Sequence, residues 1–108
     1  MMQASQVKEY FPSVKRRIDE AAQLCQITAE VPDNVRDRVG ELDREANEAV
    51  RVFEQEANDN RIRQCLDRLD KLGDRVVHAC ASVKVDDQVE NAVRQAHDAI
   101  SNLKHRLH

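Results

Sequence analysis

The sequence comprises 108 residues with a net charge of −3, of which 34% are charged and only 3% are aromatic. This length suits one domain, and two glycines with two prolines are too few for the turns of an all-β fold. Apolar residues make up 41% of the chain and recur periodically, which excludes a disordered chain. We therefore expect residues 1–108 to form a single all-α domain.

The first predicted helix covers residues 12–30, where apolar side chains recur every three or four positions. Pro12 interrupts this pattern, since proline suits the first turn of a helix but disrupts its interior. Two arrangements are compatible with this residue: a helix that begins near Phe11, or a longer helix that bends there. We favour the first, with residues 1–11 as a short helical arm.

Three further helices are predicted at residues 34–57, 60–84 and 87–107. Asp33 or Asn34 would cap the first of these, and Asp87 followed by Glu90 resembles a capping box at the start of the last. Gly40 and Gly73 interrupt the pattern, and a glycine inside a helix could allow close helix approach. The apolar seams consist of Val35, Val39, Leu42, Ala46, Ala49 and Phe53; of Ile62, Cys65, Leu69, Leu72, Val76, Ala79 and Val83; and of Val89, Ala92, Ala96, Ile100, Leu103 and Leu107.

These seams have coiled-coil-like heptad spacing, and each must be buried against the others. Short connections make consecutive helices antiparallel neighbours. The predicted fold is therefore an antiparallel up-down-up-down four-helix bundle with a short N-terminal helical arm. The rival arrangement is three long helices plus a detached arm that completes the bundle by dimerisation.

The predicted topology gathers residues 1–18, 51–67 and 99–108 at one end of the bundle. That end carries nine Lys or Arg residues and five Asp or Glu residues, a charge of +4. The remainder must carry −7, because the total is −3. The sequence thus predicts an electrically polar molecule.

The cysteines and the N-terminus bear on localisation. Cys25, Cys65 and Cys80 cannot all pair with one another, and each falls on or beside a seam, so we interpret them as reduced, buried thiols. The chain start lacks the basic and apolar regions of a signal peptide, and no apolar stretch approaches the roughly 20 residues of a membrane span. We expect a cytoplasmic protein without membrane contact. Arginine outnumbers lysine by 12 to 5, which suggests a bacterial source.

The histidines do not follow a common metal-binding or phosphotransfer pattern. Di-iron bundles use Glu-x-x-His, but no acid stands three residues before His78, His97, His105 or His108. Zinc motifs need paired ligands at short spacing, which only the two C-terminal histidines have. His78 also lacks the lysine and glycine that commonly follow a phosphoryl-accepting histidine. We expect no metal and no cofactor.

Catalysis and nucleic-acid binding are disfavoured as well. The chain has no glycine-rich phosphate loop, nucleophile elbow or Rossmann glycine pattern, so we expect neither an enzyme nor a small-molecule substrate. Lys15, Arg16 and Arg17 could contact phosphates. The acidic net charge and the scarcity of stacking aromatics argue against a nucleic-acid partner.

Protein interaction remains, because helices of small bundles commonly bind a partner helix or self-associate. We predict a non-catalytic interaction or adaptor module that forms a homo-oligomer or binds a protein partner. The predicted contact residues are Tyr10, Phe11, Arg16, Arg17, Arg61, Arg63 and Arg106. The alternative is a ligand- or metal-sensing bundle with a site between helices, formed by His97, His78 or the cysteines.

Overall fold

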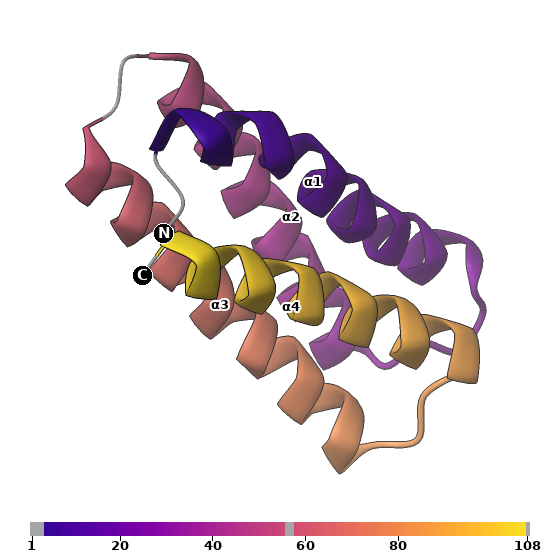
Figure 1. Ribbon diagram of the computed structural model, residues 1–108. Helices are drawn as coiled ribbons and strands as arrows, with labels where there is room; N and C mark the ends of the chain where they lie inside the picture. The colour runs from indigo at the N-terminus through magenta and orange to yellow at the C-terminus, as the bar shows by residue number, and fades with distance from the viewer. Residues whose placement is uncertain (1–3, 56–57, 108) are drawn as a thin grey trace.

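Four α-helices make up the computed structural model, which describes residues 4–55 and 58–107 (Figure 1). They are α1 (Ala4–Ile27), α2 (Asp33–Glu54), α3 (Asp59–Ser82) and α4 (Asp87–Leu107). Each helix packs mainly against two neighbours, in the cyclic order α1, α2, α3, α4 and back to α1. The start of α1, the end of α2, the start of α3 and the end of α4 lie at one end (Figure 1). The predicted antiparallel four-helix bundle is confirmed.

Some predicted features fall outside the described residues. These are residues 1–3 of the arm, the end of the second helix at residue 57, and His108. Residues 4–11, in contrast, are described, and they form the first turns of α1 rather than a separate arm.

The α1 helix continues through Pro12 without a break. Proline lacks an N–H group, so the carbonyl of Lys8 has no hydrogen bond from the backbone four residues later. Both residues are exposed, so water can serve that carbonyl, and the cost is smaller than it would be in the core. The buried side chains of Val7 and Phe11 hold the turns before the proline against the bundle. Tertiary packing thus outweighs the local penalty, which explains why our preferred helix start was wrong.

The residues that cap the N-termini of α2 and α4 differ from the predicted ones. α2 begins at Asp33 itself, preceded by Pro32, and no side chain caps it. In α3, Asn58 accepts a hydrogen bond of 2.9 Å from the backbone N–H of Arg61. At α4, Asp86 rather than Asp87 accepts a side-chain hydrogen bond, from the backbone N–H of Gln88.

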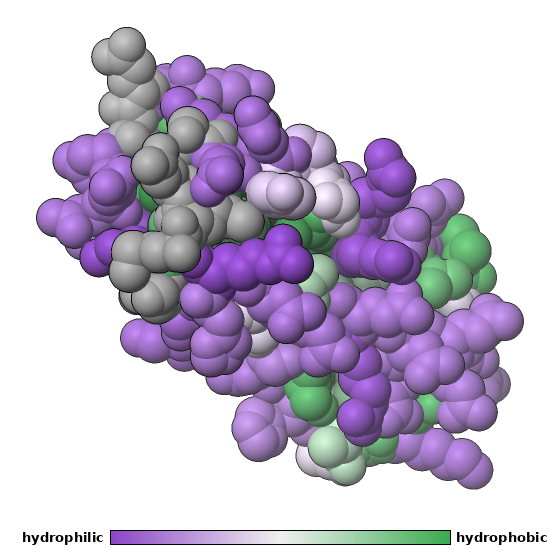
Figure 2. Space-filling model, in the orientation of Figure 1, coloured by the Kyte–Doolittle hydropathy of each residue, from purple (hydrophilic) through white to green (hydrophobic). Residues whose placement is uncertain are grey.

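One apolar core runs through the bundle. Its largest fully buried side chains come from all four helices: Val7, Ile18, Val35, Val39, Ile62, Leu66, Leu69, Val76, Val89 and Ile100. In α3 the buried stripe is wider than the predicted seam. Ile62, Leu69 and Val76 are buried as predicted, and Leu66 and Cys80 are buried as well. Cys65, Leu72 and Ala79 are only half-buried, and Val83 is 36% exposed. The stripe is wide because α3 packs against both α2 and α4, which requires more buried positions than a two-helix seam. The face shown in Figure 2 is mostly hydrophilic, with small separate apolar patches.

Candidate functional site

The arginines and the tyrosine predicted as contact residues lie mainly on the surface. Tyr10 is 46% exposed, and the guanidinium carbon of Arg106 lies 5.7 Å from its ring centroid. The start of α1 and the end of α4 therefore meet through a cation–π contact. Arg16, Arg17 and Arg61 are exposed, whereas Arg63 is half-buried.

Phe11 belongs to the core, contrary to its predicted place among surface contact residues. Its side chain is only 2% exposed, and its ring meets that of Phe53 edge-on, with ring centroids 4.9 Å apart. This pair joins the first half of α1 to the last turn of α2. The start of α1 and the end of α2 share one end of the bundle (Figure 1).

A groove of about 630 Å³ lies over this aromatic pair, between α1 and α2. Phe11, Phe53 and Val50 supply its apolar lining. Charged groups of α1 and α2 and the ring of Pro12 surround them. The complete lining is Lys8, Phe11, Pro12, Lys15, Arg16, Asp19, Val50, Phe53 and Glu54.

The rim of the groove on α1 is basic. Lys15 Nζ forms an ion pair with Asp19 Oδ2 at 2.9 Å. Among residues 4–55 and 58–107, no ion pair engages Lys8 or Arg16, and both side chains are exposed. Two cations at the groove are therefore available to an outside group.

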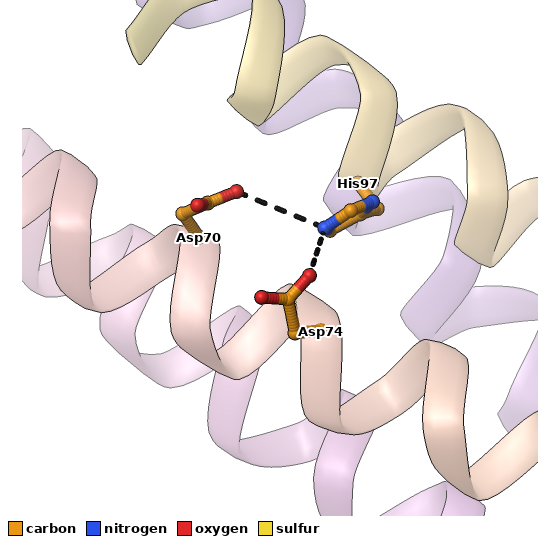
Figure 3. Close-up of side chains that lie close together, drawn as sticks. All are labelled: Asp70, Asp74 and His97. Atoms are coloured by element: carbon orange, nitrogen blue, oxygen red, sulfur yellow. Dashed lines mark hydrogen bonds and ion pairs between the residues drawn. The ribbon is translucent and has the colours of Figure 1, made fainter.

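A second concentration of polar groups lies between α3 and α4. Nε2 of His97 lies 2.5 Å from Asp74 Oδ1 and 3.7 Å from Asp70 Oδ1 (Figure 3). Ser101 Oγ donates to Asp70 Oδ1 at 2.8 Å, and Lys104 Nζ donates to Asp70 Oδ2 at 3.1 Å. We call these five residues the α3–α4 polar cluster.

The hydrogen bonds and charges of this cluster shift the pKa values of Asp70 and Lys104. Burial by itself raises the pKa of the Asp70 carboxyl. Hydrogen bonds from Ser101 and Lys104, together with the charges of Lys104 and His97, outweigh burial and hold that pKa below its ordinary value. The hydrogen bond to Asp70 in turn raises the pKa of Lys104. Asp70 is therefore an anion with a fixed orientation.

Gly73 makes room for the imidazole ring in this cluster. A Cβ atom at residue 73 would lie 2.8 Å from Cδ2 of His97, which is closer than packed carbon atoms approach. The glycine thus permits close approach of α4 to α3, as its place inside the helix suggested. Only glycine, which has no Cβ atom, leaves room at position 73 for the His97 ring in this position.

Sequence reasoning missed this cluster because its members are divided between two helices. Glu-x-x-His and closely spaced zinc ligands are patterns within a single helix. The antiparallel register of α3 and α4 places Asp70 against Ser101 and Asp74 against His97. The sequence does contain one signal: Asp70 and Asp74 stand four residues apart in a predicted helix, with Gly73 between them.

Another carboxyl pair lies between α1 and α2. Burial, a hydrogen bond with Asp19 and the negative charge of Asp19 raise the pKa of Asp43. Oδ1 of Asp43 is buried without a hydrogen-bond partner among the described residues. The pair lies beside the groove, since Asp19 also lines it.

The three cysteines carry no sign of an activated thiol. Cys25 and Cys80 are buried and Cys65 is half-buried, and all three are free. Burial raises the pKa of each thiol, which disfavours the reactive thiolate form. The two remaining described histidines, His78 and His105, are exposed.

Comparison of the chain with protein-family models, curated proteins and solved structures gave no match. Within the described ranges, none of the helices has both the length and the apolar character that crossing a membrane requires.

Proposed function

We propose that this protein is a non-catalytic interaction module that binds an acidic amphipathic helix of a partner protein in the groove between α1 and α2. The observation that carries the proposal is an apolar groove bordered by Lys8 and Arg16, cations that form no ion pair with any residue of 4–55 or 58–107. A homo-oligomer, which the sequence also suggested, becomes an outcome of the test.

The dimensions of the groove support a helical ligand. A volume of about 630 Å³ is within the range of ligand-binding pockets and accommodates several side chains of a helix. Helix-in-groove recognition uses apolar side chains at helical spacing, which would contact the half-buried Val50 above the buried rings of Phe11 and Phe53.

The charge of the rim supports an acidic rather than a self-complementary partner. Lys8, Lys15 and Arg16 line the α1 side together with Asp19, which pairs with Lys15. Glu54 lines the α2 side. In a symmetric dimer the same surface meets itself, so Lys8 and Arg16 would find only Glu54 as an acid that Lys15 does not already engage. A partner helix with Glu or Asp beside its apolar stripe would pair with them.

The proposal can be tested with a photo-crosslinking amino acid at position 8, introduced into the full chain and expressed in the source cells. The matched control carries the same amino acid at position 71, an exposed lysine on α3. After irradiation, mass spectrometry identifies the crosslinked segment of the captured protein. We expect a segment with an apolar helical stripe and flanking acids, captured from position 8 and not from position 71.

The double charge reversal Lys8→Glu with Arg16→Glu should weaken binding of that segment by about tenfold or more, since each rim charge is worth up to about 1 kcal/mol. Lys71→Glu should leave binding unchanged. Crosslinking to a second copy of this chain would show self-association and contradict the proposed partner. Capture of a segment without acids, or equal capture from position 71, would also contradict it.

A further inference from the structure

The α3–α4 polar cluster directs two carboxylates at one imidazole nitrogen. Nε2 of His97 is at hydrogen-bond distance from Asp74 Oδ1, while Asp70 Oδ1 faces the same nitrogen at 3.7 Å (Figure 3). One N–H group cannot serve both carboxylates well, because it carries a single proton. A cation between the three atoms would satisfy all of them at once.

The three ligand atoms are close enough to share one ion, since they all lie within 4.8 Å of one another. Zinc binds imidazole nitrogen and carboxylate oxygen at about 2.0–2.2 Å, so two ligand atoms on one ion lie roughly 3–4 Å apart. Small side-chain rotations of Asp70 and Asp74 would meet this requirement. We propose that Asp70, Asp74 and His97 bind one divalent transition-metal ion of the zinc type.

Two features prearrange the ligands. Gly73 leaves the space that the His97 ring occupies between the two aspartates. Ser101 and Lys104 fix the Asp70 carboxylate by hydrogen bonds, and Lys104 takes Oδ2, the oxygen that does not face His97. Hydrogen bonds of this kind orient metal ligands and commonly change affinity by 10- to 100-fold.

The site is open on one side. The side chain of Asp74 is 55% exposed, whereas those of His97 and Asp70 are 22% and 19% exposed. A metal held by three protein ligands at such a position would complete its coordination with water. It would also link α3 to α4, and a metal that binds only the folded chain stabilises it.

The test is an isothermal calorimetric titration of the full, chelator-treated chain with Zn²⁺. Thermal denaturation with and without Zn²⁺ gives the melting temperatures. All proteins carry His105→Gln and His108→Gln, so that the C-terminal histidines do not contribute. We expect one ion per chain and a melting temperature that rises with Zn²⁺. Asp74→Asn should lower the affinity at least tenfold and reduce the rise in melting temperature at a given Zn²⁺ concentration. This exposed residue can be changed without disturbing the core.

Two further site variants and two control variants separate the metal site from general surface binding. His97→Gln and Gly73→Ala should both weaken binding, the second by displacing the imidazole ring. Asp98→Asn and His78→Gln remove an exposed acid and an exposed histidine outside the cluster, and should bind Zn²⁺ as the parent does. Circular dichroism of each variant establishes that the helices are retained.

Absorption of the Co²⁺-loaded protein identifies the ligand type, because thiolate ligands give an intense sulfur-to-metal band and nitrogen and oxygen ligands do not. We expect no sulfur band. The proposal is overturned by absence of Zn²⁺ binding, by unchanged affinity in Asp74→Asn, or by a sulfur band. None of these results bears on the groove, whose residues lie on α1 and α2.

Discussion

At the scale of single residues, the carboxyl groups of Asp43 and Asp70 respond to the fold in opposite directions. The pKa of Asp43 is raised, so the folded state retains a proton that the unfolded chain releases, and stability is lost as the pH rises through this interval. The pKa of Asp70 is lowered, so its contribution is present above the unfolded pKa and is lost on acidification. Near neutral pH, Asp43 therefore opposes folding and Asp70 favours it.

We expect Asp43→Asn to raise the free energy of unfolding by about 0.5–1 kcal/mol near pH 7, a modest value because the carboxyl is partly screened by solvent. The amide removes the repulsion with Asp19 and can donate a hydrogen bond to it. The gain should shrink at about pH 3, where Asp43 is protonated in both states. Urea denaturation followed by circular dichroism at the two pH values measures this difference.

The matched control is Asp70→Asn, which should lower the free energy of unfolding near pH 7, because Lys104 loses its charged acceptor. An Asp43→Asn variant that is destabilised at neutral pH, or equally stabilised at both pH values, would contradict the raised pKa.

At the scale of the elements, Pro12 shows how packing decides the extent of a helix. α1 continues through it because Val7 and Phe11 on its N-terminal side are buried. The local cost of an interior proline, up to about 3 kcal/mol in a helix, is therefore present in the folded state.

Pro12→Ala should raise the free energy of unfolding by about 1–3 kcal/mol, since alanine restores the backbone hydrogen bond to the carbonyl of Lys8. Chemical denaturation of the full chain measures the change. Pro32→Ala is the control, because Pro32 precedes α2 and interrupts no helical hydrogen bond, so no comparable gain is expected. A Pro12→Ala variant no more stable than the parent would indicate that the helix starts near Phe11 after all.

The sequence pattern was sufficient to predict the helices, but not every buried face or the contacts between helices. Spacing of apolar residues predicted four helices and their antiparallel order, because burial of a periodic seam dominates the energy of such a bundle. It predicted too narrow a buried stripe on α3, where Leu66 is fully buried and Cys65 only half-buried, since spacing does not indicate how two neighbours share a helix face. The cluster of Asp70, Asp74 and His97 depends on the register between α3 and α4, which the pattern of one helix does not contain.

At the scale of the whole molecule, the core has no internal boundary. Buried side chains from all four helices form one cluster, and α1 packs against both α2 and α4 along the bundle. Small domains with a single core unfold in one cooperative step. The rival arrangement, with a detached arm that completes the bundle of a second copy, would instead make part of the core depend on protein concentration.

Tyr10 provides the probe that separates these alternatives, because it is the single tyrosine in a chain without tryptophan. Its fluorescence reports the start of α1, whereas far-ultraviolet circular dichroism reports all helices. We expect the two signals to give the same denaturation midpoint, independent of protein concentration. Leu69→Ala, at a fully buried position on α3, should cost about 2–5 kcal/mol and lower both midpoints equally.

The exposed Lys71 lies on the same helix, so Lys71→Ala is the control and should leave both midpoints in place. A fluorescence transition that precedes the dichroism transition and does not respond to Leu69→Ala would mean that the first turns of α1 are anchored separately from the core. A midpoint that rises with protein concentration would mean that a second chain supplies part of the core. Coincident, concentration-independent transitions would mean that the start of α1 shares its stability with α3, to which α1 is linked through α2 and α4.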